Sequence, residues 1–267
     1  MPHFIIDAEK AFAREVKEYF VRSYEAGETP NPCVMCNKQI KFGLLADFAK
    51  SMGYDGIATG HYAKIVKENG RAYLYRAADV KKDQSYFLSV LSQEQLSFAE
   101  FPLGDFTKTE IRSIAEQMDF ITAKKKDSQD ICFIADNDYV RFISEYTGES
   151  PTPGDYTDLD GKLLGQHRGH LCYTVGQRKG LGISLGKHAY VVSKNPENNT
   201  VVLGDEADLY TNNLNGKDLN LIACDSLIDG EEFTVKIRYS HPGAEAKVYN
   251  DGDGRVRVIF SSMQRAI

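Results

Sequence analysis

One change of pattern, near residue 146, constrains the fold of this 267-residue chain more than any other feature. Before it, strand-like runs at 4–6 and 56–62 alternate with helical repeats at 8–26 and 38–52. Such alternation predicts an α/β domain with a parallel sheet, whose ligands gather at the carboxyl ends of the strands. After it, frequent glycine, proline and short β-patterned runs predict mostly β structure, divided again near Tyr210. We therefore expect three domains, at 1–146, 147–209 and 210–267.

Composition narrows the cellular setting. No stretch approaches the roughly 20 apolar residues that a membrane span requires, and the N-terminus lacks a signal-peptide pattern. The five cysteines are an odd number without the spacing of a disulfide framework, which favours a reducing compartment. We expect a cytoplasmic protein that does not interact with membranes.

The net charge of −6 weighs against nucleic-acid binding, yet the charge is unevenly distributed. Between Gln166 and Pro196 there is no Asp or Glu, while five Lys and Arg residues and three His residues occur there. A second cationic cluster is Lys124-Lys125-Lys126. Each cluster is either a solvated face or a surface for phosphates.

A proline-stiffened loop, Thr29–Asn37, presents Cys33 and Cys36 in front of a helix predicted to begin at Lys38. Unpaired N–H groups at a helix N-terminus favour a thiolate, so Cys36 is a candidate reactive sulfur. The Cys-x-x-Cys spacing also suits half of a zinc site or a thioredoxin-like redox pair. The remaining cysteines are isolated from one another, however, and prolines occupy the place of the first strand. Two buried, inert cysteines remain a third interpretation.

Three further positions carry candidate chemistry. Gly60 and His61 end a predicted strand, where a bare glycine backbone lets a nucleotide approach and the histidine either binds a ligand or only caps the strand. Cys132 follows the cationic cluster, so it is a second candidate sulfur or a buried strand residue. Structural signals are a hairpin at 62–76 that turns at Asn69-Gly70 and a capping box at Thr107–Glu110.

Six sequence blocks, taken together and in order, resemble the tRNA-specific 2-thiouridylases. These enzymes replace the 2-position oxygen of the wobble uridine of tRNA with sulfur. The blocks cover nearly the whole chain: TPNPCVMCNKQIKFG, ATGHYAK, KKDQSYFL, KKDSQDICFI, HRGHLCYTVGQRKGLGI and VKIRYSHPGA.

The resemblance implies a fold and a reaction. The fold is an α/β N-terminal part, a truncated Rossmann-like ATP-pyrophosphatase domain, followed by a small mostly-β central domain and a C-terminal β-barrel. ATP, with Mg²⁺ as its counter-ion and no protein-bound metal, adenylates the uridine oxygen, which persulfide sulfur then replaces. The implied partners are the anticodon region of tRNA and a sulfur carrier or cysteine desulfurase that donates persulfide. The chain is expected to be a monomer.

Site residues follow from the resemblance position by position. Cys132 matches the cysteine that carries the persulfide, and Cys36 matches its partner, which releases the product and leaves a disulfide between the two. Gly60 matches an ATP contact. Many relatives have Asp at the position of Cys33, which leaves the role of this residue open, and Cys172 and Cys224 match packing positions. The positions that match tRNA contacts are Asn31, Pro32, Cys33, His61, Lys82, Asp83, Gln84, Arg238 and Tyr239.

The chain also departs from the family pattern. It lacks the pyrophosphate-gripping loop SGGVDSS and stops at 261–267, where the family continues with further barrel strands. We therefore expect this polypeptide alone to bind ATP poorly and not to thiolate tRNA. The alternatives are an inactive tRNA-binding fragment and a Cys-x-x-Cys thiol or metal module unrelated to tRNA.

Overall fold

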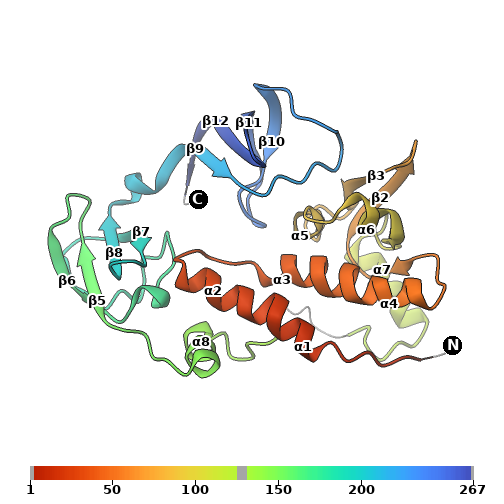
Figure 1. Cartoon of the computed structure of the whole chain (residues 1–267), viewed down its shortest axis with the longest axis horizontal. Coiled ribbons are helices and arrows are strands. Elements are labelled where there is room, and N and C mark those ends of the chain that lie inside the picture. The colour runs from red at the N-terminus through yellow and green to blue at the C-terminus, as the bar shows by residue number, and fades with distance from the viewer. Residues whose placement is uncertain (1–2, 125–130, 266–267) are drawn as a thin grey trace. The chain divides into compact units, whose positions relative to one another are not determined.

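The computed structural model of the chain describes residues 3–124 and 131–265, and these form two compact units (Figure 1). The first unit comprises Met1–Glu18, Asn31–Gln129 and Asp218–Leu227. The second comprises Tyr19–Pro30, Asp130–Lys217 and Ile228–Ile267. Across the described ranges, no helix has both the length and the apolar character needed to cross a membrane.

The first unit is an α/β structure. The helices are α1 (Glu9–Phe12), η1 (Ala13–Glu18), α3 (Pro32–Met35), η2 (Cys36–Leu44), α4 (Leu45–Ser51), α5 (Ser85–Leu88), α6 (Gln93–Phe98) and α7 (Lys108–Gln117). Its strands are β1 (Ile57–Ala58), β2 (Ala63–Glu68), β3 (Arg71–Arg76) and β4 (Ala99–Glu100). β1 and β4 pair in parallel, and β2 and β3 form the predicted hairpin. The α/β fold class is thereby confirmed.

The core of this unit lies between η2, the hairpin and α5–α6. Its buried residues are Phe42, Ala63, Ala72, Leu88, Leu91, Leu96, Ala99 and Phe101. Burial of these apolar side chains supplies the main stabilisation of the fold. The hairpin turn places Asn69 at φ +51° and Gly70 at φ +78°, the left-handed geometry that the Asn-Gly pair predicts.

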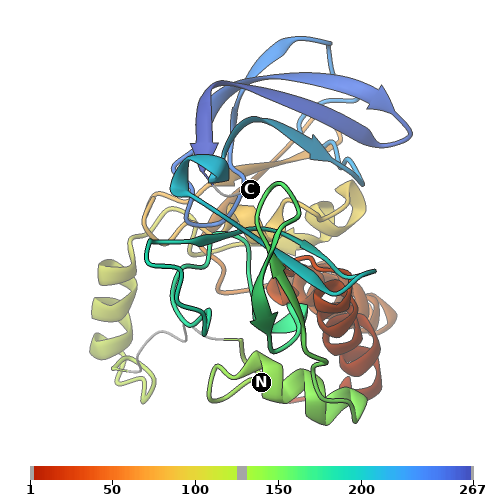
Figure 2. The ribbon, with the colours of Figure 1, turned by 90° about the vertical axis from the view of Figure 1, so that its left-hand side faces the viewer.

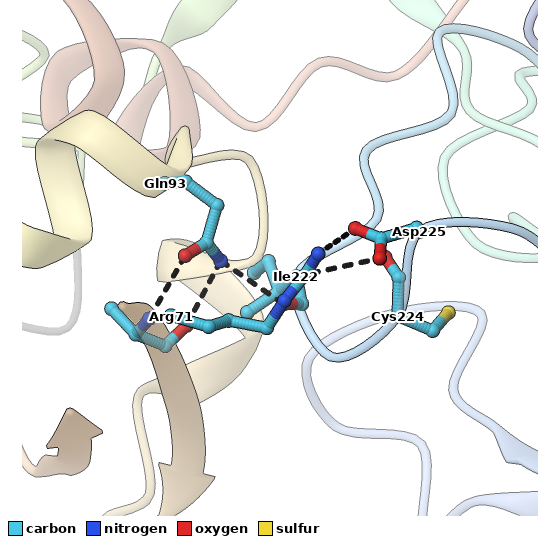
Figure 3. Close-up of polar contacts among 6 residues, drawn as sticks. Arg71, Gln93, Ile222, Cys224 and Asp225 are labelled. Carbon is cyan, nitrogen blue, oxygen red and sulfur yellow. Dashed lines mark hydrogen bonds and ion pairs between the residues drawn. The ribbon is translucent and has the colours of Figure 1, made fainter. Parts of the chain in front are cut away.

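The segment Asp218–Leu227, which connects two strands of the second unit, is anchored in this first unit by polar contacts (Figure 3). The Arg71 guanidinium donates to the carbonyl oxygens of Ile222 at 2.9 Å and Cys224 at 3.1 Å, and it pairs with Asp225. Gln93 Nε2 donates to the Ile222 carbonyl at 3.0 Å, and the Ile222 side chain packs on the core. This connection is therefore integral to the α/β unit.

The second unit contains a four-stranded sheet in the order β6-β5-β8-β7. The strands are β5 (Gly154–Thr157), β6 (Leu163–His167), β7 (Tyr190–Asn195) and β8 (Thr200–Gly204), with the short helix η3 (His170–Cys172) between β6 and β7. Its core consists of Tyr156, Tyr173, Leu181, Ala189, Val191, Val201 and Leu203.

Two helices of the same unit form a separate apolar cluster. α2 (Tyr19–Glu25) contributes Phe20, Val21 and Tyr24, and α8 (Tyr139–Thr147) contributes Ile143. Ile134 completes the buried set, and Phe133 packs against it, with its ring 5.5 Å from that of Phe20. The turn around Cys132 is thus held by packing on both sides.

A second four-stranded sheet, antiparallel throughout, has the order β10-β11-β12-β9. Its strands are β9 (Tyr210–Gly216), β10 (Glu231–Val235), β11 (Ala244–Gly252) and β12 (Arg255–Arg265), and the helix η4 (Glu206–Leu209) precedes β9. Figure 2 shows the long strands β11 and β12 side by side. The mostly-β second half is confirmed. The division into three domains stays a prediction.

Three predictions of local structure are wrong. Residues 4–6 form no strand, and Ile5 is 90% exposed, because a three-residue apolar run has no partner strand to pair with here. The helix predicted from Lys38 begins at Pro32, because proline is well suited to the first helical position. Cys132 is exposed in a turn, so the buried-strand interpretation fails.

Candidate functional site

The predicted cysteine loop is largely helical. Asn31 has extended backbone at the N-cap position, and Pro32 is buried at the first helical position of α3. Cys33 is exposed in the first turn, and Cys36 is half-buried at the start of η2. Both sulfurs therefore lie on a rigid helix rather than on a loop.

η2 is wound as a π-helix, with hydrogen bonds between residues five apart. The Gln95 side-chain amide contacts this helix, donating to the Lys38 carbonyl at 2.8 Å and to the Phe42 carbonyl at 3.0 Å. In a π-helix, Cys36 and Lys41 lie one turn apart on the same side. The winding thus puts a cation on the Cys36 face of the helix.

His61 is buried beside this helix. Its Nε2 lies 3.4 Å from Lys41 Nζ, and its Nδ1 lies 2.7 Å from Thr59 Oγ1. Lysine can only donate, so Nε2 accepts and the proton of the neutral ring sits on Nδ1, facing Thr59. Burial, reinforced by the Lys41 charge, lowers the pKa of His61 from 6.5 to about 4. The imidazole is neutral at physiological pH, and its bond to Thr59 is the local contact that the strand-capping interpretation predicts.

The Lys82–Gln84 turn is hydrogen-bonded to the segment that carries His61. Gln84 Oε1 accepts from the Tyr62 N–H at 2.9 Å, and the Gln84 N–H donates to the Tyr62 carbonyl at 2.7 Å. Two motifs separated by more than 20 residues in sequence are thereby fixed next to each other.

Asp83, within that turn, is buried, and its carboxylate forms hydrogen bonds within the protein. Its carboxylate accepts from the Ala77 N–H at 3.0 Å, the Ser85 N–H at 3.3 Å and the Ser85 hydroxyl at 2.8 Å. These bonds lie just before α5, whose N-cap residue Gln84 makes no side-chain cap hydrogen bond. Contacts of Lys82, Asp83 and Gln84 with tRNA stay predictions.

Gly60 is exposed just beyond the carboxyl end of β1, the parallel strand. A Cβ built there would meet only Leu103, at 3.7 Å, so the backbone is open to a ligand. Carboxyl ends of parallel strands are where α/β proteins bind nucleotides. The contact of Gly60 with ATP stays a prediction.

Cys132 belongs to the second unit. The Ile134 N–H donates to the Ile131 carbonyl at 2.9 Å, which closes a turn that exposes Cys132 between apolar neighbours. Of the cationic cluster before it, Lys125 and Lys126 lie outside the described residues, and Lys124 is exposed.

Arg238 and Tyr239 also belong to the second unit, in the connection between β10 and β11. Tyr239 is exposed, with Lys236 Nζ 5.8 Å from its ring centroid. The His241 N–H donates to the Arg238 carbonyl at 3.0 Å, and the buried His241 ring contacts Gln264 Oε1 at 3.1 Å. The bend that carries Arg238 is thus tied to β12.

The other two cysteines have structural surroundings. Cys172 packs on the core of the second unit, and burial raises the pKa of its thiol. Cys224 offers its carbonyl to Arg71 in the anchored segment. Within 3–124 and 131–265, no three His, Cys, Asp or Glu side chains gather as metal ligands would.

Sequence reasoning missed three residues of this site. Lys41 and Thr59 contact His61, and Asn37 is buried beside Cys36 with its amide donating to the Phe87 carbonyl at 3.2 Å. Asn37 Oδ1 has no hydrogen-bond donor among the described groups. Only the π-helical winding aligns Lys41 with Cys36, and no residue pattern signals it.

Comparison with known proteins gives matches along the whole chain. Residues 1–136 match the model of the tRNA methyl transferase HUP domain, and 140–205 match the tRNA methyl transferase PRC-barrel domain. The tRNA-specific 2-thiouridylase MnmA of Acetivibrio thermocellus is 46% identical over all of this chain and 75% of its own length. That of Lachnoclostridium phytofermentans is 44% identical over the same shares, and that of Clostridioides difficile is 42% identical over all of this chain and 74% of its own length.

Proposed function

Because the chain belongs to the family of tRNA-specific 2-thiouridylases, we propose that it acts as the sulfurtransferase that converts a tRNA uridine to 2-thiouridine. The observation that carries this proposal is the pair of hydrogen bonds between Gln84 and Tyr62. They join the Lys82–Gln84 turn to the Gly60–His61 edge, in the unit that also contains Cys36. Gly60, the Lys82–Gln84 turn and Cys36, with proposed roles toward nucleotide, tRNA and sulfur, thus belong to one unit, whereas Cys132 belongs to the other.

The proposed reaction uses two sulfurs. ATP turns the 2-position oxygen of the wobble uridine into a leaving group by adenylation, and pyrophosphate is released. The terminal sulfur of a persulfide on Cys132 attacks carbon 2, and AMP departs with the oxygen. The Cys36 thiolate then attacks the Cys132 sulfur, which releases 2-thiouridine and leaves a disulfide between Cys36 and Cys132. External thiols reduce this disulfide, and a persulfide donor reloads Cys132.

Several features of the chain support these roles. Cys132 is exposed on a packed turn, where a donor protein has access to its sulfur. Cys36 lies one π-helical turn from Lys41 in η2. Gly60 has an open backbone suited to the nucleotide, with Mg²⁺ as the counter-ion of its phosphates. Arg238 and Tyr239 lie on a bend suited to the anticodon region.

The test is thiolation of a tRNA transcript with a uridine at the wobble position, supplied with ATP and a persulfide donor. It uses a version of the chain that carries a family phosphate loop upstream. Cys132→Ser should abolish 2-thiouridine formation, and Cys36→Ser should leave a sulfur-linked tRNA adduct on Cys132. Cys224→Ser is the matched control and should retain activity. Unchanged thiolation by Cys132→Ser would remove the persulfide role.

A further inference from the structure

The acid-free stretch from Gln166 to Pro196 does not present all of its basic side chains to solvent. Lys194 is half-buried: its Nζ donates to the Tyr173 carbonyl at 3.0 Å and lies 5.9 Å from the Tyr24 ring centroid. His170 contacts Asn199 Oδ1 at 3.0 Å and the Glu25 carbonyl at 3.2 Å. His167 is 3% exposed. Arg168 is exposed, and the other basic side chains that remain for an external anion lie on the loop 178–188.

That loop has a regular in-and-out pattern. Leu181, Ile183 and Leu185 pack on the core of the sheet β6-β5-β8-β7, and the three residues that follow them are exposed: Gly182, Ser184 and Gly186. Alternation of this kind puts one set of side chains inside and the other on the surface. Gly182, Ser184 and Gly186, all small residues, therefore form the outer surface of the loop, which we call the Gly182–Gly186 floor. Gly182 and Gly186 have no atom within 4 Å of an added Cβ.

Hydrogen bonds fix this loop in place. The hydroxyl of Tyr156, which is fully buried, donates to the Leu181 carbonyl at 2.7 Å. Gln177 Oε1 accepts from the Thr174 N–H at 3.0 Å, and its Nε2 donates to the Lys179 carbonyl at 2.9 Å. A ligand at this loop would meet a preformed surface, which lowers the entropy cost of binding.

Cations border a cavity beside this loop. The cavity, of about 400 Å³, is lined by Arg178, Ser184, Lys187 and His188 together with glycines and apolar residues of the loop, among them Leu181, Ile183 and Leu185. Lys187 also pairs with Asp205 at 2.9 Å. None of the residues that line the cavity is acidic, and none is Phe, Tyr or Trp. The site thus has the charge for phosphate, but it lacks the large aromatic faces on which unpaired bases stack.

We infer that the loop 178–188 binds the phosphodiester backbone of the tRNA, with Arg178 as the principal phosphate contact and the Gly182–Gly186 floor admitting the strand. This inference rests on the proposed function, because tRNA is the polyanion that the function supplies. Contacts with phosphates add affinity and position the protein on the tRNA, but they do not distinguish one base from another.

The test measures binding of the 267-residue chain to two tRNA transcripts, one with uridine and one with cytidine at the wobble position, between about 50 and 200 mM salt. Each phosphate contact contributes about 0.7 to 0.9 to the slope of log affinity against log salt concentration. Arg178→Gln should reduce the slope by about that amount, and equally for both transcripts. Lys162→Gln removes an exposed charge on the β5–β6 turn and is the matched control, with an unchanged slope.

A second pair of variants tests the floor through charge alone. Ser184→Glu should weaken binding by about tenfold, since it sets a carboxylate against phosphate, whereas the isosteric Ser184→Gln should bind almost as the parent does. Unfolding temperatures of all variants should match, because these side chains are exposed.

The outcomes separate the two proposals. A parent chain that binds neither transcript overturns the proposed function. A parent chain that binds, with Arg178→Gln and Ser184→Glu equal to their controls, overturns the loop assignment alone. A slope change confined to the uridine transcript would mean base readout and would also overturn the assignment.

Discussion

The ammonium of Lys41 lies 3.4 Å from Nε2 of the buried His61, one π-helical turn from Cys36. A neutral histidine accepts from this lysine and donates to Thr59, so the three side chains form one polar chain. Because His61 is neutral, Lys41 is the charged member of this polar chain, and it lies on the side of η2 that carries Cys36. The consequences of this arrangement for titration are measurable.

The first prediction concerns the pKa of His61. NMR titration of the imidazole signals should show one histidine with a midpoint near pH 4, assigned by its loss in His61→Gln. Burial is the main cause, because it disfavours the charged ring. A His61 midpoint close to 6.5 would show that water reaches the ring freely.

The same shift makes stability depend on pH. The unfolded chain binds a proton at His61 below about pH 6.5, while the folded chain resists it down to about pH 4. The free energy of unfolding is therefore highest above pH 6.5. It decreases progressively as the pH falls to 4, by about 3 kcal/mol in total. Urea unfolding at several pH values should give a flatter profile for His61→Gln than for the parent across this window. Parallel profiles would contradict the prediction.

The third prediction separates the two causes of the shift. Lys41→Met should raise the His61 midpoint, because the lysine charge lowers it, yet the midpoint should stay below 6.5, because burial is the larger cause. Lys38→Met, an exposed lysine on the same helix, is the control and should leave the midpoint nearly unchanged. Equal changes of the His61 midpoint in both variants would show that the contact of Lys41 with Nε2 does not contribute to the lowered pKa.

The fourth prediction concerns the anchored segment. Gln93 bonds both the N–H and the carbonyl of Ala72, and it donates to the Ile222 carbonyl as well. Gln93→Met should cost about 2 kcal/mol of unfolding free energy, because part-buried peptide groups lose their partners. Limited proteolysis should then cut faster within 218–227. Ser97→Ala on the exposed side of α6 is the control, and matching cleavage rates would refute the anchoring role.

The fifth prediction ranks the thiols. Mass spectrometry after brief alkylation near pH 8 should find Cys33 and Cys132 modified well before Cys172. The first two are exposed, whereas Cys172 is half-buried with a raised thiol pKa, so it offers little thiolate. Early modification of Cys172 would mean that its packing on the core is loose.

Local signals in the sequence determined much of this protein. The Asn69-Gly70 turn and the Thr107–Glu110 capping box are dictated by nearest neighbours, and both are found. The six motif blocks are sufficient to identify the family, because residue identity at many positions is itself the signal. Cys36, Gly60 and the Lys82–Gln84 turn were chosen as candidates in this way, and their roles stay predictions.

Tertiary structure decided what depends on partners distant in the chain. Gln95 contacts the π-helix that aligns Lys41 with Cys36, and the Tyr62 backbone meets Gln84 only after the hairpin and α5 have packed. Lys194 and Arg178 look alike in a charge count, yet one is half-buried against Tyr24 and the other borders an open cavity. Burial depends on which surfaces meet in the fold, so sequence supplied the chemical groups and packing selected those left available to bind.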